Sequence, residues 1–272
     1  MVISIYKKIN LIWIAWGCIP RVPLKTKLQL FIKPLESTRY TEITYIFYFI
    51  KSNLLDLSLC LDVSSPYILA YILSKKNRVI KTDIFPDERR FITESDNLKF
   101  EIQDALALKY KDNVFSFVYS ISAIEHIYKG LHKSVNEMVR VTKPGGHIYI
   151  SFPVSAKYQE EWLDNKIYSD QYVNNNKTFF QYRLDNILLE SFLNKLDNVS
   201  VIEKKIYWEK KNGNYNKMIS KLRNTCGISA IDYLKNALIN LYYGFSLLKS
   251  SPENFKKAKD YGNLSIILKK IK

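Results

Sequence analysis

Short polar segments follow four apolar runs of this chain, at the points where buried strands would end. In an open parallel sheet, ligands bind beyond the carboxyl ends of the strands, near the switch in strand order. The residues at these points are Asp62 with Ser64 and Ser65, Asp83, Asp104 with Ala105, and Ser120 with Ser122.

The first two aspartates have a spacing that suggests nucleotide chemistry. Asp83 lies 21 residues after Asp62, close to the spacing at which an acidic residue holds a ribose in dinucleotide folds. A carboxylate suits that role because it accepts hydrogen bonds from two adjacent hydroxyls. A solvated turn aspartate would give the same spacing, so the residues alone leave both interpretations open.

Glu125 and His126 come just after the fourth apolar run. The imidazole has an unperturbed pKa near neutrality, so His126 could border an active site or accept a proton from a substrate hydroxyl. A histidine that only fixes the loop at the start of a helix would look the same. His126 is thus a candidate catalytic residue with a structural alternative.

The cysteines and histidines indicate no metal site. Cys18, Cys60 and Cys226 are far apart, and the chain has only three histidines, so no zinc spacing occurs. An odd cysteine count also argues against a disulfide framework. A reducing, cytoplasmic compartment fits this pattern best.

The elements that must position these residues alternate between strands and helices. Strands are predicted over 57–63, 79–82, 98–103, 114–120 and 147–152, and helices over 40–51 and 67–74. Before the fifth strand, Pro144, Gly145 and Gly146 end a helix and allow a tight reversal. The alternation predicts an α/β fold with a parallel sheet and right-handed crossovers.

The second half of the chain has a less regular pattern. We predict a helix over 179–196, a strand over 199–208, mostly helical structure over 217–259 and a last strand over 264–271. The apolar helical stretch 228–249 is interrupted by polar residues, which argues against a transmembrane helix. We interpret it as a lid over the substrate cleft; the alternative is an interfacial helix that contacts a membrane.

The N-terminal apolar run 9–19 is too short to span a bilayer. It follows Lys7 and Lys8 but lacks a clear cleavage site, so a signal peptide is not favoured. We expect a short helix that packs on the domain or lies at a membrane surface.

The chain is strongly basic, with a formal net charge of +15. Its lysines are spread along the whole length, and no basic stripe with interleaved aromatic residues occurs on one helix. We therefore interpret the charge as a solvated lysine-rich surface and do not expect nucleic acid as a partner.

Five segments together resemble the type 11 branch of class I S-adenosylmethionine (SAM) dependent methyltransferases. They are LDVSSP at 61–66, TDI at 82–84, QDA at 103–105, FSFVYSISAIEHI at 115–127 and EMVRVTKPGG at 137–146. The resemblance covers about residues 38–154 and, more loosely, the FFQYRLD segment at 179–185. It implies a Rossmann-like, mostly parallel seven-stranded sheet flanked by helices, with SAM as the cofactor.

The resemblance also implies roles for individual residues. Asp62 matches the acidic residue near the methionine end of SAM, Asp83 matches the ribose ligand, and Asp104 with Ala105 matches the adenine contact. The remaining matched positions are Ser64, Ser65 and Pro66 in the first loop, Ser120 and Ser122 beside cofactor and substrate, and Arg39, Tyr40 and Glu42 on a helix that closes over SAM.

The first loop departs from the family pattern, which is usually rich in glycine. Here Ser64, Ser65 and Pro66 stand in its place, and glycines are what let a backbone approach a ligand closely. SAM lacks a pyrophosphate and so needs fewer bare amides than NAD does. Ser65 is also a suitable N-cap and Pro66 a suitable first residue for the helix that follows.

From these observations we expect an N-terminal extension over 1–37, a methyltransferase-like α/β domain over 38–213 and 260–272, and a helical insertion over 214–259 before the last strand. The expected activity is direct methyl transfer from SAM to a small-molecule or glycan-type acceptor. The alternative is a catalytically silent module of the same fold that binds a partner or a membrane surface. We expect a cytoplasmic protein, with peripheral membrane contact as a variant of that location.

Overall fold

The computed structural model describes residues 1–53, 57–166, 171–225 and 229–272. Cys226 and the first residue of the predicted lid helix, Ile228, lie outside these ranges. Among the described residues, no helix is both long enough and apolar enough to cross a membrane.

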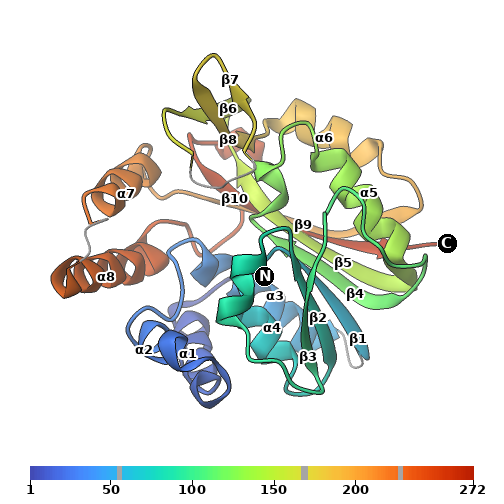
Figure 1. The fold of residues 1–272 in the computed structure, drawn as a ribbon. Coiled ribbons are helices and arrows are strands. Elements are labelled where there is room, and N and C mark those ends of the chain that lie inside the picture. The colour runs from blue at the N-terminus through green and yellow to red at the C-terminus, as the bar shows by residue number, and fades with distance from the viewer. Residues whose placement is uncertain (54–56, 167–170, 226–228) are drawn as a thin grey trace.

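A seven-stranded sheet forms the centre of the molecule, in the order β3-β2-β1-β4-β5-β10-β9 (Figure 1). Its strands are β1 (Leu59–Val63), β2 (Arg78–Asp83), β3 (Leu98–Ile102), β4 (Phe115–Ile121), β5 (Thr142–Val154), β9 (Val199–Trp208) and β10 (Gly262–Lys270). The first five pair in parallel, and β10 runs antiparallel to both β5 and β9. The predicted mostly parallel seven-stranded sheet is confirmed.

The strand order reverses between β1 and β4, so the crevice expected to hold ligands lies at their carboxyl ends. Both strands are almost completely buried, because apolar residues cover both faces of a parallel sheet. At the start of β5, Gly145 has a φ of +78°. A Cβ on Gly146 would lie 2.8 Å from the carbonyl oxygen of Lys143, so the PGG turn requires both glycines.

Helices cover both faces of the sheet. One face carries α3 (Arg39–Asn53) and α4 (Ile68–Leu73), whose buried side chains share one apolar core with α1 (Ile5–Trp16). The other face carries α5 (Leu131–Val141) and α6 (Asn186–Asn194), which pack in a second core. Short 3-10 turns occur at Ile19–Arg21, Pro86–Phe91, Ile124–His126 and Phe255–Lys257.

The N-terminal helices and the late insertion lie beside each other at one side of the sheet (Figure 1). They are α1 and α2 (Leu24–Ile32), with α7 (Asn214–Arg223) and α8 (Ala230–Ser246). The buried Lys8 ammonium donates to the Gly244 carbonyl at 2.7 Å, and the Ser37 amide donates to Asn240 Oδ1 at 3.0 Å. These bonds join segments more than 200 residues apart in the sequence.

The predicted helix over 179–196 is wrong in its first part. Residues Lys177–Arg183 form strand β8, which pairs with β6 (Gln159–Leu163) and β7 (Val173–Asn174) in a separate three-stranded sheet. The aromatic residues of this stretch favour a strand. The Asp185 carboxylate then accepts from the Leu188 amide and begins α6, as expected of an N-cap.

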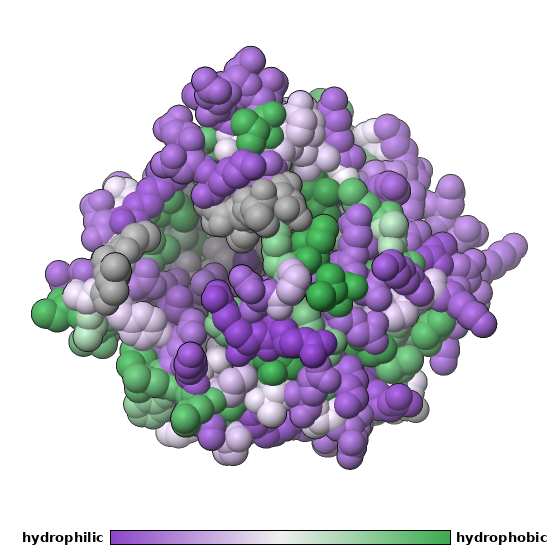
Figure 2. Space-filling view, in the orientation of Figure 1, coloured by the Kyte–Doolittle hydropathy of each residue, from purple (hydrophilic) through white to green (hydrophobic). Residues whose placement is uncertain are grey.

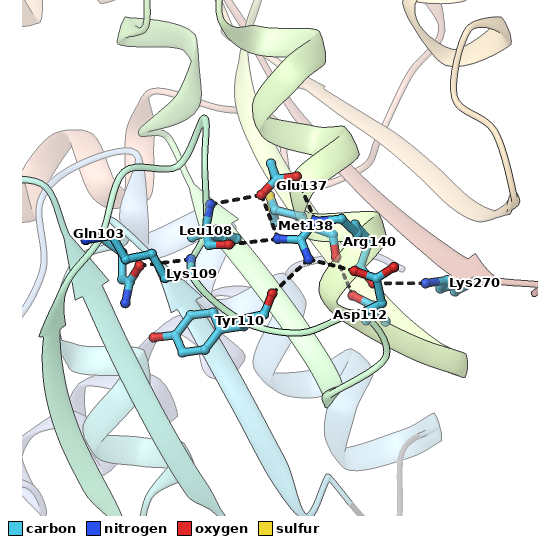
Figure 3. A network of polar contacts seen from close by, with 10 residues as sticks. Gln103, Leu108, Lys109, Tyr110, Asp112, Glu137, Met138, Arg140 and Lys270 are labelled. Carbon is cyan, nitrogen blue, oxygen red and sulfur yellow. Dashed lines mark hydrogen bonds and ion pairs between the residues drawn. The ribbon is translucent and has the colours of Figure 1, made fainter.

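The loop that carries Asp104 is held by α5 through a charged network (Figure 3). Glu137 accepts from the Leu108 amide at 2.9 Å, and the Arg140 guanidinium donates to the carbonyls of Leu108 and Tyr110, both at 2.8 Å. Arg140 is in turn paired with Glu137 at 2.8 Å. The EMVR segment before the PGG turn thus fixes the backbone that follows β3.

Candidate functional site

The loop after β1 is closed upon itself by internal bonds. The Ser64 amide donates to the Thr82 carbonyl at 3.0 Å, and the Ser65 amide donates to Asp62 Oδ1 at 2.8 Å. Ser64 has a φ of +55°, a left-handed conformation that favours glycine. Ser64 thus adopts a backbone conformation that is typical of glycine. The amides of Ser64 and Ser65 both donate within the protein and are not open to a ligand.

A buried lysine completes this loop. Lys81 from β2 is 1% exposed; its Nζ lies 3.7 Å from Asp62 Oδ1 and donates to the Ser65 carbonyl at 2.5 Å. The Asp62 carboxyl is fully buried, and burial raises its pKa to about 6 although the Lys81 charge acts in the opposite direction. Asp62 therefore holds the loop together through Lys81 and Ser65. Nothing in the spacing of the sequence marks this lysine as buried.

Ser65 anchors the loop rather than capping a helix. Its hydroxyl accepts from the Ile121 amide at 3.0 Å, while the N-cap position of α4 is Tyr67 and carries no side-chain cap. The prediction that Ser65 caps this helix is therefore wrong. Ser120 is likewise turned inward: it is fully buried and donates to the Val63 carbonyl at 2.9 Å.

Asp83 and Asp104 stand just where predicted, at the ends of β2 and β3. Asp83 Oδ1 accepts from the Phe85 amide at 3.0 Å, and Asp104 Oδ1 accepts from the Leu106 amide at 2.8 Å. Burial and the nearby charge of Asp83 raise the pKa of Glu88, so a second carboxyl stands near the end of β2. Ala105 is buried beside this site.

Helix α3 contributes an ion pair above the end of β4. The Arg39 guanidinium lies 2.6 Å from the fully buried Glu42, which also accepts from the hydroxyls of Ser122 at 2.5 Å and Ser151 at 2.7 Å. Burial acts to raise the pKa of Glu42, but the Arg39 charge and the hydrogen bond from Ser122 outweigh it and the pKa is lowered. Glu42 is thus a buried carboxylate that anchors Arg39.

Two cavities meet at Arg39. The smaller, of about 80 Å³, is lined by residues of α2, α3 and the first loop, including Pro66 and Tyr67. The larger, of about 270 Å³, is lined by Ser122, Glu125 and His126 on one side and by residues of α7 and α8 on the other. Arg39 lines both, together with Lys33 and Glu36. Asp62, Asp83 and Asp104 line neither of them.

Glu125 and His126 form the floor of the larger cavity. His126 Nδ1 lies 2.5 Å from the Phe180 carbonyl, so this nitrogen carries the proton and donates. Burial lowers the pKa of His126 to about 4, which makes the imidazole neutral at physiological pH. His126 is therefore only a weak base, which disfavours its predicted role as a proton acceptor.

Glu125 is 1% exposed, and its Oε2 has no hydrogen-bond partner in the part of the chain that the structure describes. Burial raises its pKa to about 8, although the Arg39 charge opposes the change. A carboxyl with a pKa near the working pH can exchange protons with a ligand. The sequence predicts the catalytic role for the neighbouring His126 and assigns none to Glu125.

The helical insertion supplies the opposite wall of this cavity. Tyr215 and Met218 come from α7, and Asn236 and Asn240 from α8. Behind them, Arg183 lies 4.6 Å from the ring of Tyr215 and 5.2 Å from that of Tyr261, two rings that stack on each other at 3.8 Å. Most of this wall consists of residues that no motif marks in the sequence.

The residues present fit SAM at its adenosine end. Asp83 uses one carboxylate oxygen on the Phe85 amide and keeps the other as an acceptor for hydroxyls. Next to it, Ile84 is 40% exposed and offers apolar surface to a flat ring. At the methionine end the first loop offers no amide from Ser64 or Ser65. Arg39, whose buried Nε has no partner among the described residues, is the cationic side chain between the first loop and the end of β4.

Comparison with known proteins agrees with this geometry. Residues 60–150 match the family model of a methyltransferase domain. A norajmaline N-methyltransferase of Rauvolfia serpentina is 42% identical over 55 residues, which are 20% of this chain and 18% of that protein. The matched segment is thus less than a fifth of the relative's length.

Solved structures share the fold at low identity. A coclaurine N-methyltransferase bound to N-methylheliamine and SAH is 16% identical, with a TM-score of 0.54 over 85% of this chain and 72% of that one. A phosphoethanolamine-type N-methyltransferase of Haemonchus contortus, in complex with S-adenosylhomocysteine, is 14% identical, with a TM-score of 0.50 over 84% and 52%.

The sheet order and the match over residues 60–150 agree with the class I SAM-dependent methyltransferases, the class that the sequence predicted. Residues 60–150 thus match a methyltransferase domain, and SAM is the cofactor of that class. The rest of the described chain adds helices, strands β9 and β10 of the same sheet, and the three-stranded sheet of β6, β7 and β8.

Proposed function

We propose that this protein transfers the methyl group of SAM directly to a small-molecule acceptor held in the larger cavity. The observation that supports this best is the junction of two cavities at Arg39. One reaches Pro66 and Tyr67 on the first loop, and the other reaches Glu125 and His126. SAM held at the ends of β2 and β3 would extend its methionine end to Arg39 and face an acceptor in the larger cavity, where alignment of the reacting groups supplies much of the rate.

Asp83 and Arg39 would hold the two ends of SAM in this proposal. The free oxygen of Asp83 accepts from ribose hydroxyls, and Asp104 with Ala105 borders the adenine. Arg39 donates from Nη1 to Glu42 and, over a long 3.4 Å, from Nη2 to the Ser122 carbonyl, so its Nε–Nη2 edge would bind the methionine carboxylate, a task for which guanidinium geometry is suited. SAM supplies an electrophilic methyl group on a sulfonium, so the protein need not provide a nucleophile.

We propose an amine nitrogen as the acceptor atom. Three of the similar proteins are named N-methyltransferases. An amine must also be unprotonated to attack, and Glu125 is a buried carboxyl with a pKa of about 8 and an unpartnered oxygen. Its carboxylate form would take the proton from the acceptor's ammonium group before transfer. A glycan-type acceptor stays a prediction of the sequence alone.

We also propose a cytoplasmic location for the protein. Cys18 and Cys60 are free and buried, as expected of a cytoplasmic protein in a reducing compartment.

The cofactor assignment can be tested by isothermal titration with SAM and with 5′-methylthioadenosine, which lacks the amino-acid end. Asp83→Asn should weaken both ligands at least about tenfold, because it weakens the ribose contact that both share. Arg39→Lys keeps the charge next to Glu42 but loses the fork, so it should weaken SAM and leave 5′-methylthioadenosine unchanged. Thermal melting of each variant checks that the fold is retained.

Binding of SAM and 5′-methylthioadenosine together decides whether the proposal holds. Saturable binding of SAM with this pattern supports the proposal. Absence of SAM binding by the wild-type protein would overturn it and is the result expected of a silent module. Equal weakening of both ligands by Arg39→Lys would show that Arg39 does not contact the methionine end.

A further inference from the structure

Three helices of the N-terminal extension and the insertion each expose one apolar stripe. On α1, Ile5, Tyr6, Ile9 and Trp13 are 42% to 75% exposed. On α2, Leu24, Leu28 and Phe31 are 81%, 66% and 58% exposed. On α8 the exposed residues are Ile231, Leu234, Leu238, Leu241 and Tyr242. Spacings of three and four residues place each set on one side of its helix.

The three helices pack against one another, so their stripes belong to one region of the surface. The Lys8 ammonium of α1 bonds the Gly244 carbonyl of α8, and the Tyr233 hydroxyl of α8 lies 3.5 Å from the Gln29 carbonyl of α2. Figure 2 shows hydrophobic surface over the outer ends of α8 and α2 at the lower left. Exposed apolar side chains grouped in one region in this way are typical of an interaction site.

Most charges of the same helices are positive, the exception being Asp232 of α8. Helices α1 and α2 carry no acidic residue and four lysines, of which Lys8 is buried. Lys25 directly follows the exposed Leu24, and Lys27 directly precedes the exposed Leu28. Lys235 is exposed between Leu234 and Leu238 of α8, and Lys221 and Arg223 are exposed on the neighbouring α7. Apolar side chains thus alternate with cations across this surface.

We propose that the exposed stripes of α1, α2 and α8, here called the docking surface, bind peripherally to an anionic lipid bilayer. Leucine and isoleucine side chains enter the headgroup boundary, where Trp13, Tyr6 and Tyr242 are suited to lie. The adjacent lysines meet the negative surface potential. A second copy of this chain fits less well, because joining two such surfaces would oppose lysine to lysine.

Docking in this way would place the larger cavity close to the lipid surface. Asn236 and Asn240 of α8 line the cavity, while Leu234 and Leu238 on the same helix are exposed. Lys33, which follows the exposed Phe31 of α2, lines both cavities. The binding itself does not depend on methyl transfer, so it can be tested without the reaction.

Co-sedimentation with vesicles tests the proposal. The full chain is mixed with vesicles of phosphatidylcholine alone, or of phosphatidylcholine with phosphatidylserine, and the bound fraction is measured. We expect binding to the anionic vesicles that weakens as salt is raised, because the lysine contribution is screened. The double variant L24S/L28S should lower the partition coefficient at least about tenfold, since two apolar side chains no longer enter the lipid.

A matched control removes two exposed apolar residues from another part of the molecule. Ile187 on α6 is 76% exposed and Val201 on β9 is 46% exposed, so I187S/V201S should bind vesicles like the wild type. Sedimentation velocity without lipid follows self-association, and thermal melting follows the fold. No binding to anionic vesicles, or equal binding by L24S/L28S, would overturn the proposal. A dimer that L24S/L28S dissociates would also overturn it, since the surface would then be a self-contact.

Discussion

Replacement of Glu125 by glutamine should stabilise the protein, and most strongly at alkaline pH. Glu125 is 1% exposed, and burial raises the pKa of its carboxyl from 4.5 to about 8. The folded protein therefore holds the proton more tightly than the unfolded chain does. The stability from this protonation is complete below about pH 4.5 and is lost as the pH rises through 8.

The size of the effect follows from the two pKa values. A tenfold difference in proton affinity corresponds to about 1.4 kcal/mol. The difference between 4.5 and about 8 thus costs the wild type about 5 kcal/mol at pH 8 and above, and about 3 kcal/mol at pH 7. Glutamine has nearly the same shape and carries no charge, so Glu125→Gln avoids this loss at every pH.

Urea unfolding at pH 5, 7 and 9 measures the difference between variant and wild type. Glu125→Gln should gain little at pH 5, about 3 kcal/mol at pH 7 and most at pH 9. The control Glu94→Gln changes an exposed carboxyl in a surface ion pair with Arg89, and its effect should stay within about 1 kcal/mol. A difference that does not vary with pH, or a less stable Glu125→Gln at pH 9, would refute the reasoning.

Three further substitutions test the fold around the site by urea unfolding. Lys81→Met removes the cation beside Asp62, whose pKa then rises further, so the loss should be small at pH 5 and reach about 3–5 kcal/mol at pH 8. Gly244→Ala should cost about 1–3 kcal/mol, because its Cβ would lie 2.3 Å from the Tyr40 ring. At Ser64, with its φ of +55°, valine should cost about 2 kcal/mol and glycine less than about 1 kcal/mol. Equal stability of Ser64→Val and Ser64→Gly, an unchanged Gly244→Ala, or a pH-independent Lys81→Met would each contradict the geometry.

Much of the sheet was predictable because buried parallel strands are nearly continuous apolar runs. The strand predicted over 199–208 has the observed bounds of β9, and the five parallel strands differ mainly at their ends. The failure at 179–183 has a physical cause. Its aromatic residues suit a helix entry and a strand alike, and only pairing with β6, a non-local contact, selects the strand.

The positions of the site residues were predictable from the sequence, but the chemical roles of their carboxyl groups were less so. Asp62, Asp83 and Asp104 lie at or just beyond the strand ends because the strand pattern sets their register. What each carboxyl does depends on neighbours that come from other elements. Lys81 pairs with Asp62 inside the protein, and the pKa of Glu125 reflects its burial together with the charge of Arg39, which comes from a much earlier helix. Spacing along the sequence carries no information on either.

The absence of glycine from the first loop is linked to the buried ion pair between Asp62 and Lys81. A glycine-rich loop leaves its amides open to a ligand, whereas Ser65 bonds Asp62, Lys81 and Ile121 with its amide, carbonyl and hydroxyl. These bonds tie the loop to β1, β2 and β4, so it keeps its shape without glycine. The anion-binding task that such amides would perform then needs another donor. Arg39 is anchored by the buried Glu42 and lines the cavity that also contains Pro66. The serine–proline loop and the arginine on α3 are therefore best understood as one arrangement, in which the loop provides rigidity and Arg39 provides the charge.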